Sequence, residues 1–390
     1  MRILFCHQNF PGRFGFMAGS LAADPNNEVL FASCHQRRGA TVPGVRRVIL
    51  RTERLRRPPR EENYAQIWCR FLLSGKSGYT FLERLNAEFQ PECVFSSASG
   101  GVTFFAQKAF PRAFHVFYAG VEEALWPGAD FTEGSRAALA MQWVQMLQSQ
   151  LCFIFSERQR ELFPPALRAG LRYLTPWVDT DWMCPDSAEA VPRDGVAPAP
   201  ELVSFDMRHF RLAAASDLRD LMRDLLTARP DCRIVACFGG NPAFTLFDAW
   251  RARLPQPLGH RLRVVDFLRP AEYRDMFRAT CLHVCADASP SSLPGWREAM
   301  SCGAALMMPA ADAFSDALLK PGETMLTLPR GSRQDRLTAV LHPLERPEMR
   351  AAVWRAARGA VVAARSPQTL VPPHLATVLE AYERYKSDPQ

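Results

Sequence analysis

The chain has 390 residues, which is too long for one ordinary hydrophobic core and predicts two domains of roughly 200 residues or fewer. Its composition, 48% hydrophobic and 22% charged, is typical of a globular protein, and no stretch approaches the roughly 20 apolar residues of a membrane-spanning helix. The net charge is +7 and arginine supplies most of the positive charge, but no nucleic-acid-binding motif accompanies it, so we expect no nucleic-acid partner.

The first residues, MRILFCHQNF, contain only a short apolar run, which predicts a β-strand and not a signal peptide. The eleven cysteines are scattered, many within apolar runs, and this usage indicates a reducing cytoplasm. No two cysteines have the two-residue separation of a zinc knuckle or redox motif. We therefore expect no metal, and we expect Cys281 and Cys285 to lie in the core.

Short apolar runs alternate with longer mixed segments in the first half of the chain, as in a parallel sheet with helical crossovers. Continuous apolar runs predict strands buried on both faces. The predicted strands are Arg2–Cys6, Glu28–Ser33, Cys93–Ser96, Ala113–Tyr118 and Leu151–Ser156, and a helix is predicted over Arg136–Gln148.

Nine arginines lie between Arg37 and Arg60, and Glu53 is the one acid among them. Two interpretations stay open for this block. It is either a solvated loop without a partner, or a patch that contacts an anionic membrane surface or an acidic acceptor. The second would place a cytoplasmic protein peripherally at the inner membrane face.

Repeated prolines and small polar residues over 184–200 predict a linker between a first domain, 1–183, and a second, 201–360. Residues 361–390 form a helical tail that would pack back on the first domain. The alternation resumes after the linker. It predicts strands at Leu202–Phe205, Arg233–Phe238, Arg263–Phe267, Leu282–Ala286 and Ala304–Met308, and helices at Asp217–Thr227, Thr245–Arg253, from Ala271, and at Gly295–Ser301. Two Rossmann-like domains are the expected fold class.

Ligands of open parallel sheets bind beyond the carboxyl ends of the strands, so the residues just after each strand are the candidate site. Glycine there lets backbone approach a ligand, arginine pairs with a diphosphate, and helix N-termini favour phosphate. Each position also has an ordinary structural interpretation, as a turn, a surface arginine or a helix-dipole carboxylate. The candidates are Gly12, Arg208, Arg211, Gly239, Gly240, Leu268, Ser291, Ser292, Leu293 and Glu298.

Several segments together resemble the family 4 glycosyltransferases, in particular the subgroup that opens with HQNFPG. The opening MRILFCHQNFPGRF matches it nearly residue for residue, and the helix segment Trp296–Gly303 resembles the W-x-x-E-A-M-x-C-G of its donor site, one residue shorter between tryptophan and glutamate. The resemblance covers most of residues 1–330 and implies the GT-B fold, with two Rossmann-like domains facing a central cleft. Further landmarks in the same order are Phe163-Pro-Pro, Asp179-Thr-Asp181 with Pro185, and Arg229–Gly240.

The resemblance implies that Glu298 holds the donor ribose, Arg208 binds the diphosphate, Ser291–Leu293 contribute backbone donors, and Gly12 faces the diphosphate from the first domain. It implies a hexosyltransferase-like enzyme that transfers a sugar from a nucleotide-sugar donor with retention and without a metal or further cofactor. A glycan of the cell envelope, a lipid and a protein all stay open as acceptors. No general base is identified.

The chain departs from the family at three places. Ala214 stands near the position of the usual lysine, Pro290 replaces a second glutamate found in many members, and Ser97–Val102 replaces a histidine-containing segment. The acceptor pocket would instead be lined by Ser97, Ser99, Glu122, Glu123 and Trp126, and the last three of these could equally form an exposed turn. The alternative is therefore a catalytically silent GT-B binding or accessory subunit, whereas no residue supports a nucleotide-sugar epimerase.

Overall fold

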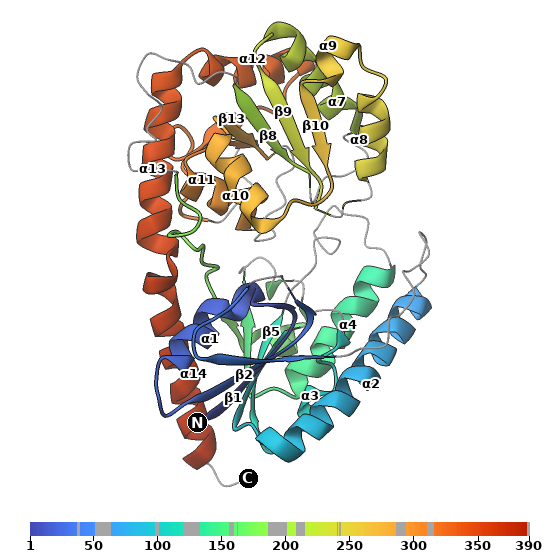
Figure 1. Cartoon of the computed structure of the whole chain (residues 1–390), viewed down its shortest axis with the longest axis vertical. Helices are drawn as coiled ribbons and strands as arrows, with labels where there is room; N and C mark the ends of the chain where they lie inside the picture. Colours follow the sequence, from blue (N-terminus) through green and yellow to red (C-terminus); the bar gives the residue numbers. More distant parts are fainter. Residues whose placement is uncertain are drawn as a thin grey trace. The chain divides into compact units, whose positions relative to one another are not determined.

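The computed structural model of the chain contains two compact units (Figure 1). The first comprises Met1–Thr175 with Leu370–Gln390, and the second comprises Pro176–Thr369. The residues described are 1–36, 40–50, 64–97, 101–119, 133–155, 160–161, 163–185, 201–207, 215–239, 241, 243–285, 294–309 and 316–387.

The first unit is built on a seven-stranded parallel sheet with the order β3-β2-β1-β4-β5-β6-β7. Phe5 of the first strand, β1, stacks between Phe31 and Phe95 of the two neighbouring strands, and its ring centroid lies 5.9 and 4.5 Å from theirs. These rings form the middle of the core. The strands are β1 (Arg2–Phe10), β2 (Glu28–Gln36), β3 (Val45–Ile49), β4 (Cys93–Ser97), β5 (Phe114–Ala119), β6 (Leu151–Ile154) and β7 (Leu171–Tyr173).

In the described residues, a helix lies between each pair of successive strands except β2 and β3. The longest is α2, which spans Tyr64–Phe89 and contacts α3 and α4. The others are η1 (Gly12–Phe14), α1 (Gly15–Ala22), α3 (Ala106–Ala109), α4 (Glu133–Leu147) and α6 (Pro165–Arg168).

The last helix, α14 (Pro367–Ser387), places most of its length on the first unit. The buried Tyr118 hydroxyl and His374 Nε2 lie 2.6 Å apart, and the Tyr382 hydroxyl donates to Glu92 at 3.2 Å. Because Tyr118 stacks on Phe153 in the sheet, the helix is joined to the middle of the core and not only to its surface.

The second unit contains a six-stranded parallel sheet with the order β10-β9-β8-β11-β12-β13. Its strands are β8 (Leu202–Asp206), β9 (Arg233–Cys237), β10 (Leu262–Val265), β11 (Leu282–Val284), β12 (Ala305–Pro309) and β13 (Leu326–Leu328). Its helices are α7 (Ala215–Ala228), α8 (Ala243–Arg251), α9 (Gln256–Gly259), α10 (Pro270–Ala279), α11 (Pro294–Cys302), α12 (Arg333–Leu344) and α13 (Pro347–Arg365).

Both sheets have the strand order 3-2-1-4-5-6 of the Rossmann fold, with a seventh strand added to the first. This confirms the predicted fold class of two Rossmann-like halves. The chain order reverses between β1 and β4 in one sheet and between β8 and β11 in the other, so each unit has one switch point beside its first strand.

The two units divide between Thr175 and Pro176, whereas the linker was predicted at 184–200. Residues 176–183 belong to the second unit through contacts such as the Val178 amide donating to the Arg365 carbonyl at 2.9 Å. Of the predicted linker itself, the structure describes Cys184 and Pro185 alone.

None of the helices in the described ranges combines the length and apolar character needed to cross a membrane.

Candidate functional site

The switch point of the second unit lies where β8 and β11 end side by side. Asp206 is the last residue of β8, and Cys285 directly follows β11. Crevices at such points bind the ligands of doubly wound sheets, because neighbouring connections there leave toward opposite faces of the sheet. Of the predicted donor residues of the second unit, the structure describes Gly239, Leu268 and Glu298.

Residues after β9 turn the chain toward the same edge. Gly239 has a φ of +56°, which favours glycine, and its amide donates to the Asp266 carbonyl at 2.6 Å. Asn241 Nδ2 donates to the Met207 carbonyl at 3.0 Å, while its Oδ1 accepts from the Ala243 amide at the start of α8. Asn241 therefore joins the β9–α8 loop to the end of β8, a role that the sequence pattern did not indicate.

Leu268, another predicted donor-site residue, follows β10 and is half-buried. It packs against the core cluster that also contains Trp296 and Met300 of α11. Its predicted part in donor binding stays a prediction, whereas the packing contact of its side chain is a feature of the fold.

Glu298 lies in the second turn of α11 and is the only member of residues 296–302 that is not buried. Its neighbours in the helix pack in the core, where one hydrophobic cluster contains Trp296, Ala299, Met300 and Cys302. Gly303 ends the helix with a φ of +98°, where a Cβ atom would overlap the Trp354 indole. The motif therefore serves mainly to anchor the helix, and Glu298 is its candidate ligand-binding side chain.

A buried ion cluster holds α11 in place. Arg297, which precedes Glu298, donates to Asp316 at 2.7 Å, and Arg365 donates to the other oxygen of the same carboxylate at 2.8 Å. Burial alone would raise the pKa of Asp316, but the positive charges of Arg297 and Arg365 outweigh it and the pKa is lowered. The position of Glu298 is thus tied to a charge network inside the unit.

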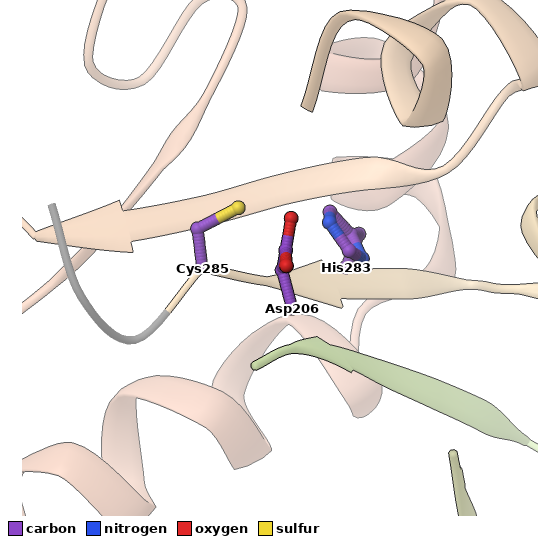
Figure 2. A group of neighbouring side chains, drawn as sticks. All are labelled: Asp206, His283 and Cys285. Atoms are coloured by element: carbon purple, nitrogen blue, oxygen red, sulfur yellow. The ribbon is translucent and has the colours of Figure 1, made fainter. Parts of the chain in front are cut away.

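Three potential metal-ligating side chains gather at the switch point itself. Figure 2 shows the carboxylate of Asp206 between the thiol of Cys285 and the ring of His283. One ligand atom from each lies within 4.8 Å of the other two. His283 and Cys285 are buried, as was expected for Cys285, and Asp206 is partly buried.

The switch point of the first unit contains the loop after β1. Gly12 has a φ of +50°, and a Cβ atom there would lie 2.6 Å from His7 Nδ1. His7 is buried, and its Nδ1 accepts from the Asn9 amide at 3.1 Å. The Phe10–Pro11 peptide, directly before Gly12, is cis. Burial, and secondarily the charge of Arg13, lowers the pKa of His7 to about 4, so its ring is neutral at pH 7.

Ser97, predicted on the acceptor side, is the last residue of β4 and is buried. Its carbonyl accepts from the Thr103 hydroxyl at 2.7 Å, and Gln145 Nε2 donates to the Thr103 carbonyl and hydroxyl at 3.2 Å. The backbone of Ser97 is therefore part of an internal network. His115, expected to be a buried core histidine, is buried and its Nε2 bonds to the Phe110 carbonyl at 2.8 Å.

The remaining candidates fall outside the described residues and stay predictions. They are Arg208, Arg211, Gly240, Ser291, Ser292, Leu293, Ser99, Glu122, Glu123 and Trp126.

Two arginines of the predicted anion-binding block, Arg46 and Arg47, lie on β3. Arg46 pairs with Glu28 at 3.2 Å, and the guanidinium of Arg47 lies 4.9 Å from the centre of the Phe10 ring. Both arginines therefore have partners within the unit. The members at 37, 38, 51, 54, 56, 57 and 60 lie outside the described residues.

Solved structures of other proteins share this fold over nearly their whole length. Sucrose-phosphate synthase from Thermosynechococcus elongatus has a TM-score of 0.68 at 13% identity, covering 98% of this chain and 100% of that one. Anabaena Alr3699/HepE in complex with UDP-glucose has a TM-score of 0.66 at 16% identity, with coverage of 98% and 100%. The putative UDP-N-acetylglucosamine 2-epimerase from Listeria monocytogenes has a TM-score of 0.58 at 11% identity, with coverage of 98% and 97%. Identities this low show the fold alone.

No curated protein sequence matches the chain. Residues 25–183 do match the family described as the glycosyl transferase family 4 group. This segment contains most of the first sheet and the landmarks Phe163-Pro-Pro and Asp179-Thr-Asp181 that carried part of the resemblance. Residues 25–183 are therefore similar to the glycosyl transferase family 4 group, and the chain shares its fold of two Rossmann-like sheets with the solved structures named above.

Proposed function

We propose that the chain transfers a sugar from a nucleoside-diphosphate donor to a glycan, lipid or protein acceptor, with retention at the anomeric carbon and without a metal ion at the diphosphate. The observation that supports it best is Glu298. In a helix segment whose other side chains are buried, this single carboxylate is partly exposed, on the helix that follows β11 in the chain.

A carboxylate is suited to bind the ribose of a nucleotide, because its two oxygens accept hydrogen bonds from the adjacent 2′- and 3′-hydroxyls. Such recognition requires a carboxylate in a fixed position. The buried pair of Arg297 and Asp316, and the end of α11 at Gly303, supply that rigidity. Glu298 is thus a donor-binding residue in this proposal.

Transfer of the sugar leaves a diphosphate, so the main catalytic demand is stabilisation of the charge that develops on this leaving group. Arg208 and Arg211 follow β8 in sequence, and the amino terminus of α11 carries the positive end of the helix dipole. Together they would supply the charge that a divalent cation supplies in other transferases. The nucleotide donor is then a substrate, and no further cofactor is required.

Donors with a uridine base are the first to test. Anabaena Alr3699/HepE, which shares the fold, has been solved with UDP-glucose. The fold of an epimerase is also similar, and therefore only the products can separate transfer from epimerisation.

The acceptor side is assigned to the first unit, with Ser97, Ser99, Glu122, Glu123 and Trp126 as its candidate residues. A membrane-bound or anionic acceptor would be attracted by the arginines between Arg37 and Arg60. Replacing Arg51, Arg54, Arg56 and Arg57 by alanine should weaken binding to vesicles that contain anionic lipid. Unchanged vesicle binding would remove the support for this contact.

Transfer is tested by measuring the turnover of each nucleotide sugar in a panel. Where no acceptor is known, the slow hydrolysis of the donor is measured instead. Losing a hydrogen bond to a charged group costs about 1.5–3 kcal/mol, so Glu298→Gln should lower kcat/KM roughly 10- to 150-fold. Glu323→Gln is the matched control, because its side chain is 60% exposed and pairs with the exposed Lys320. Added Mg²⁺ or Mn²⁺ should not raise the rate.

A chain that binds a donor but never turns it over would instead be a silent binding subunit, the alternative suggested by Ala214 and Pro290. If Glu298→Gln and Glu323→Gln had equal rates, the assignment of Glu298 to the donor site would be wrong.

A further inference from the structure

The residues Asp206, His283 and Cys285 combine three kinds of ligand atom at one edge of the second sheet: a carboxylate oxygen, an imidazole nitrogen and a thiol sulfur. They come from two neighbouring strands. The register pairs Val284 with Phe205, so the side chains at 283 and 285 share a face of the sheet with those at 204 and 206. The cluster is therefore a product of the sheet order and not of a single loop.

We propose that these three side chains bind a zinc-class divalent cation. Zn²⁺ is bound in proteins by cysteine, histidine and carboxylate ligands, whereas Mg²⁺ and Ca²⁺ require oxygen ligands almost exclusively. Three protein ligands leave the fourth position of a tetrahedral site open. That position is expected to hold water.

The charges of the cluster fit a doubly charged ion. A carboxylate and a thiolate contribute two negative charges and a neutral imidazole contributes none, so the loaded site is neutral overall. Neutrality matters here because His283 and Cys285 are 1% and 7% exposed, and an uncompensated charge at that depth is costly. Binding releases the thiol proton of Cys285 to solvent, since the thiolate is the ligand.

The distances require only a small closure. In a tetrahedral zinc site, bonds of about 2.0–2.3 Å place the ligand atoms about 3.3–3.6 Å from one another. The ligand atoms of the three side chains lie within 4.8 Å of one another, and small changes of side-chain torsion would bring them to the separations of a zinc site.

The imidazole is already oriented. Its Nδ1 and the buried Ser204 hydroxyl are 2.8 Å apart, and its ring meets the Phe277 ring edge-on at 5.0 Å between centroids. Histidine ligands of metals usually have such a partner on their second nitrogen, which fixes the tautomer and the ring plane. Ser204 is thus a positioning residue, and the other nitrogen of His283 would take the metal.

The site would also act on the local fold. An ion held by Asp206 and Cys285 crosslinks the carboxyl ends of β8 and β11, the strands that lead in sequence to Arg208 and to Ser291–Leu293. Metal binding does not depend on the proposed transfer, and it is measured without any sugar donor.

The test uses the full chain, stripped with a chelator, desalted under reducing conditions and titrated with Co²⁺ and then Zn²⁺. Co²⁺ bound to a thiolate gives a near-ultraviolet charge-transfer band, so the spectrum reports the cysteine ligand directly. The wild-type chain should bind one Co²⁺ with this band, and Zn²⁺ should displace it.

Variants identify the ligands. Cys285→Ser should remove the charge-transfer band, and Asp206→Asn and His283→Gln should each weaken Zn²⁺ binding by more than tenfold, because even second-sphere partners are typically worth about 10–100-fold. Ser204→Ala should weaken Zn²⁺ binding by about 10–100-fold, the range typical of such second-sphere partners. Cys281→Ser is the matched control, since this half-buried thiol lies four residues before Cys285 outside the cluster and should leave the spectrum unchanged.

Thermal unfolding without metal shows whether each variant folds. The proposal is overturned if the folded wild-type chain gives no thiolate band with Co²⁺, or if Cys281→Ser removes the band as completely as Cys285→Ser. The first result would leave a hydrogen-bonded polar cluster, and the second would indicate adventitious binding by free thiols. Neither result bears on the turnover of nucleotide sugars.

Discussion

Removing the carboxylate of Asp316 tests whether a buried charge network holds the donor-site helix. In the native chain this carboxylate pairs with Arg297 at 2.7 Å and with Arg365 at 2.8 Å. The side chains of the three residues are only 5–13% exposed. Asp316→Ala therefore leaves two buried arginines without their shared partner.

The expected cost is large. Deleting one partner of a buried ion pair typically lowers the free energy of unfolding by about 3–5 kcal/mol, because the remaining charge stays buried. In a domain of this size each kcal/mol shifts Tm by about 2–4 °C, so a fall in Tm of roughly 6–20 °C is expected. Binding of the nucleotide should weaken as well, since Arg297 is adjacent to Glu298 in α11.

The assay is thermal and urea unfolding, with Asp275→Ala as the matched control. Asp275 also contacts two arginines, Arg274 at 2.8 Å and Arg278 at 3.7 Å, but its side chain is 56% exposed. Surface pairs of this kind are worth about 0–1 kcal/mol. Equal stability of the two variants would refute the claim that the Asp316 network holds α11.

Two further predictions concern stability. Gly303→Ala should destabilise the chain by more than about 1–2 kcal/mol, because φ is +98° and a Cβ would overlap Trp354. Gly359→Ala should stabilise it by about 0.5–1 kcal/mol, because Gly359 lies in the middle of α13 and a Cβ there would have nothing within 4 Å. Urea unfolding of both variants measures these changes, and equal effects on the free energy of unfolding would contradict the prediction. Burial lowers the pKa of His374 to about 4, so its neutral form stabilises the fold above the unfolded pKa of about 6.5, and this contribution is lost as the pH falls from about 6.5 to about 4. His374→Gln should therefore lose less stability than the wild type over that pH interval, as measured by urea unfolding at each pH. If the two proteins lost equal stability, the pH dependence could not be assigned to His374.

Much of the fold could be predicted because parallel strands are buried on both faces and read as apolar runs. Cys93–Ser97 and Phe114–Ala119 are buried at every position. The strand Val45–Ile49 was missed, since it lies at the edge of the sheet and carries Arg46 and Arg47 in its middle. At an edge, such a strand resembles a charged loop in sequence.

The site was predicted only as far as local motifs extend. Glu298 could be predicted as a donor-site residue because it lies in the short motif Trp296–Gly303. In the structure the other residues of that motif pack in the core. Asp206 and His283 lie far apart in sequence and meet only because β8 and β11 are adjacent in the sheet. The same holds for Asp316 and Arg365, whose contacts depend on tertiary structure and leave no spacing pattern in the chain.

The most direct measurement is calorimetric titration of the chain with UDP, GDP, ADP, CMP and their sugars, repeated on Glu298→Ala, Arg208→Ala and the control Glu323→Ala. One nucleotide and its sugar should bind the wild type and the control alike, and both donor-site variants should bind it at least roughly tenfold more weakly, since each loses a charged hydrogen bond. Absence of binding by every nucleotide tested, or equal binding by all four proteins, would contradict a donor site in the second unit.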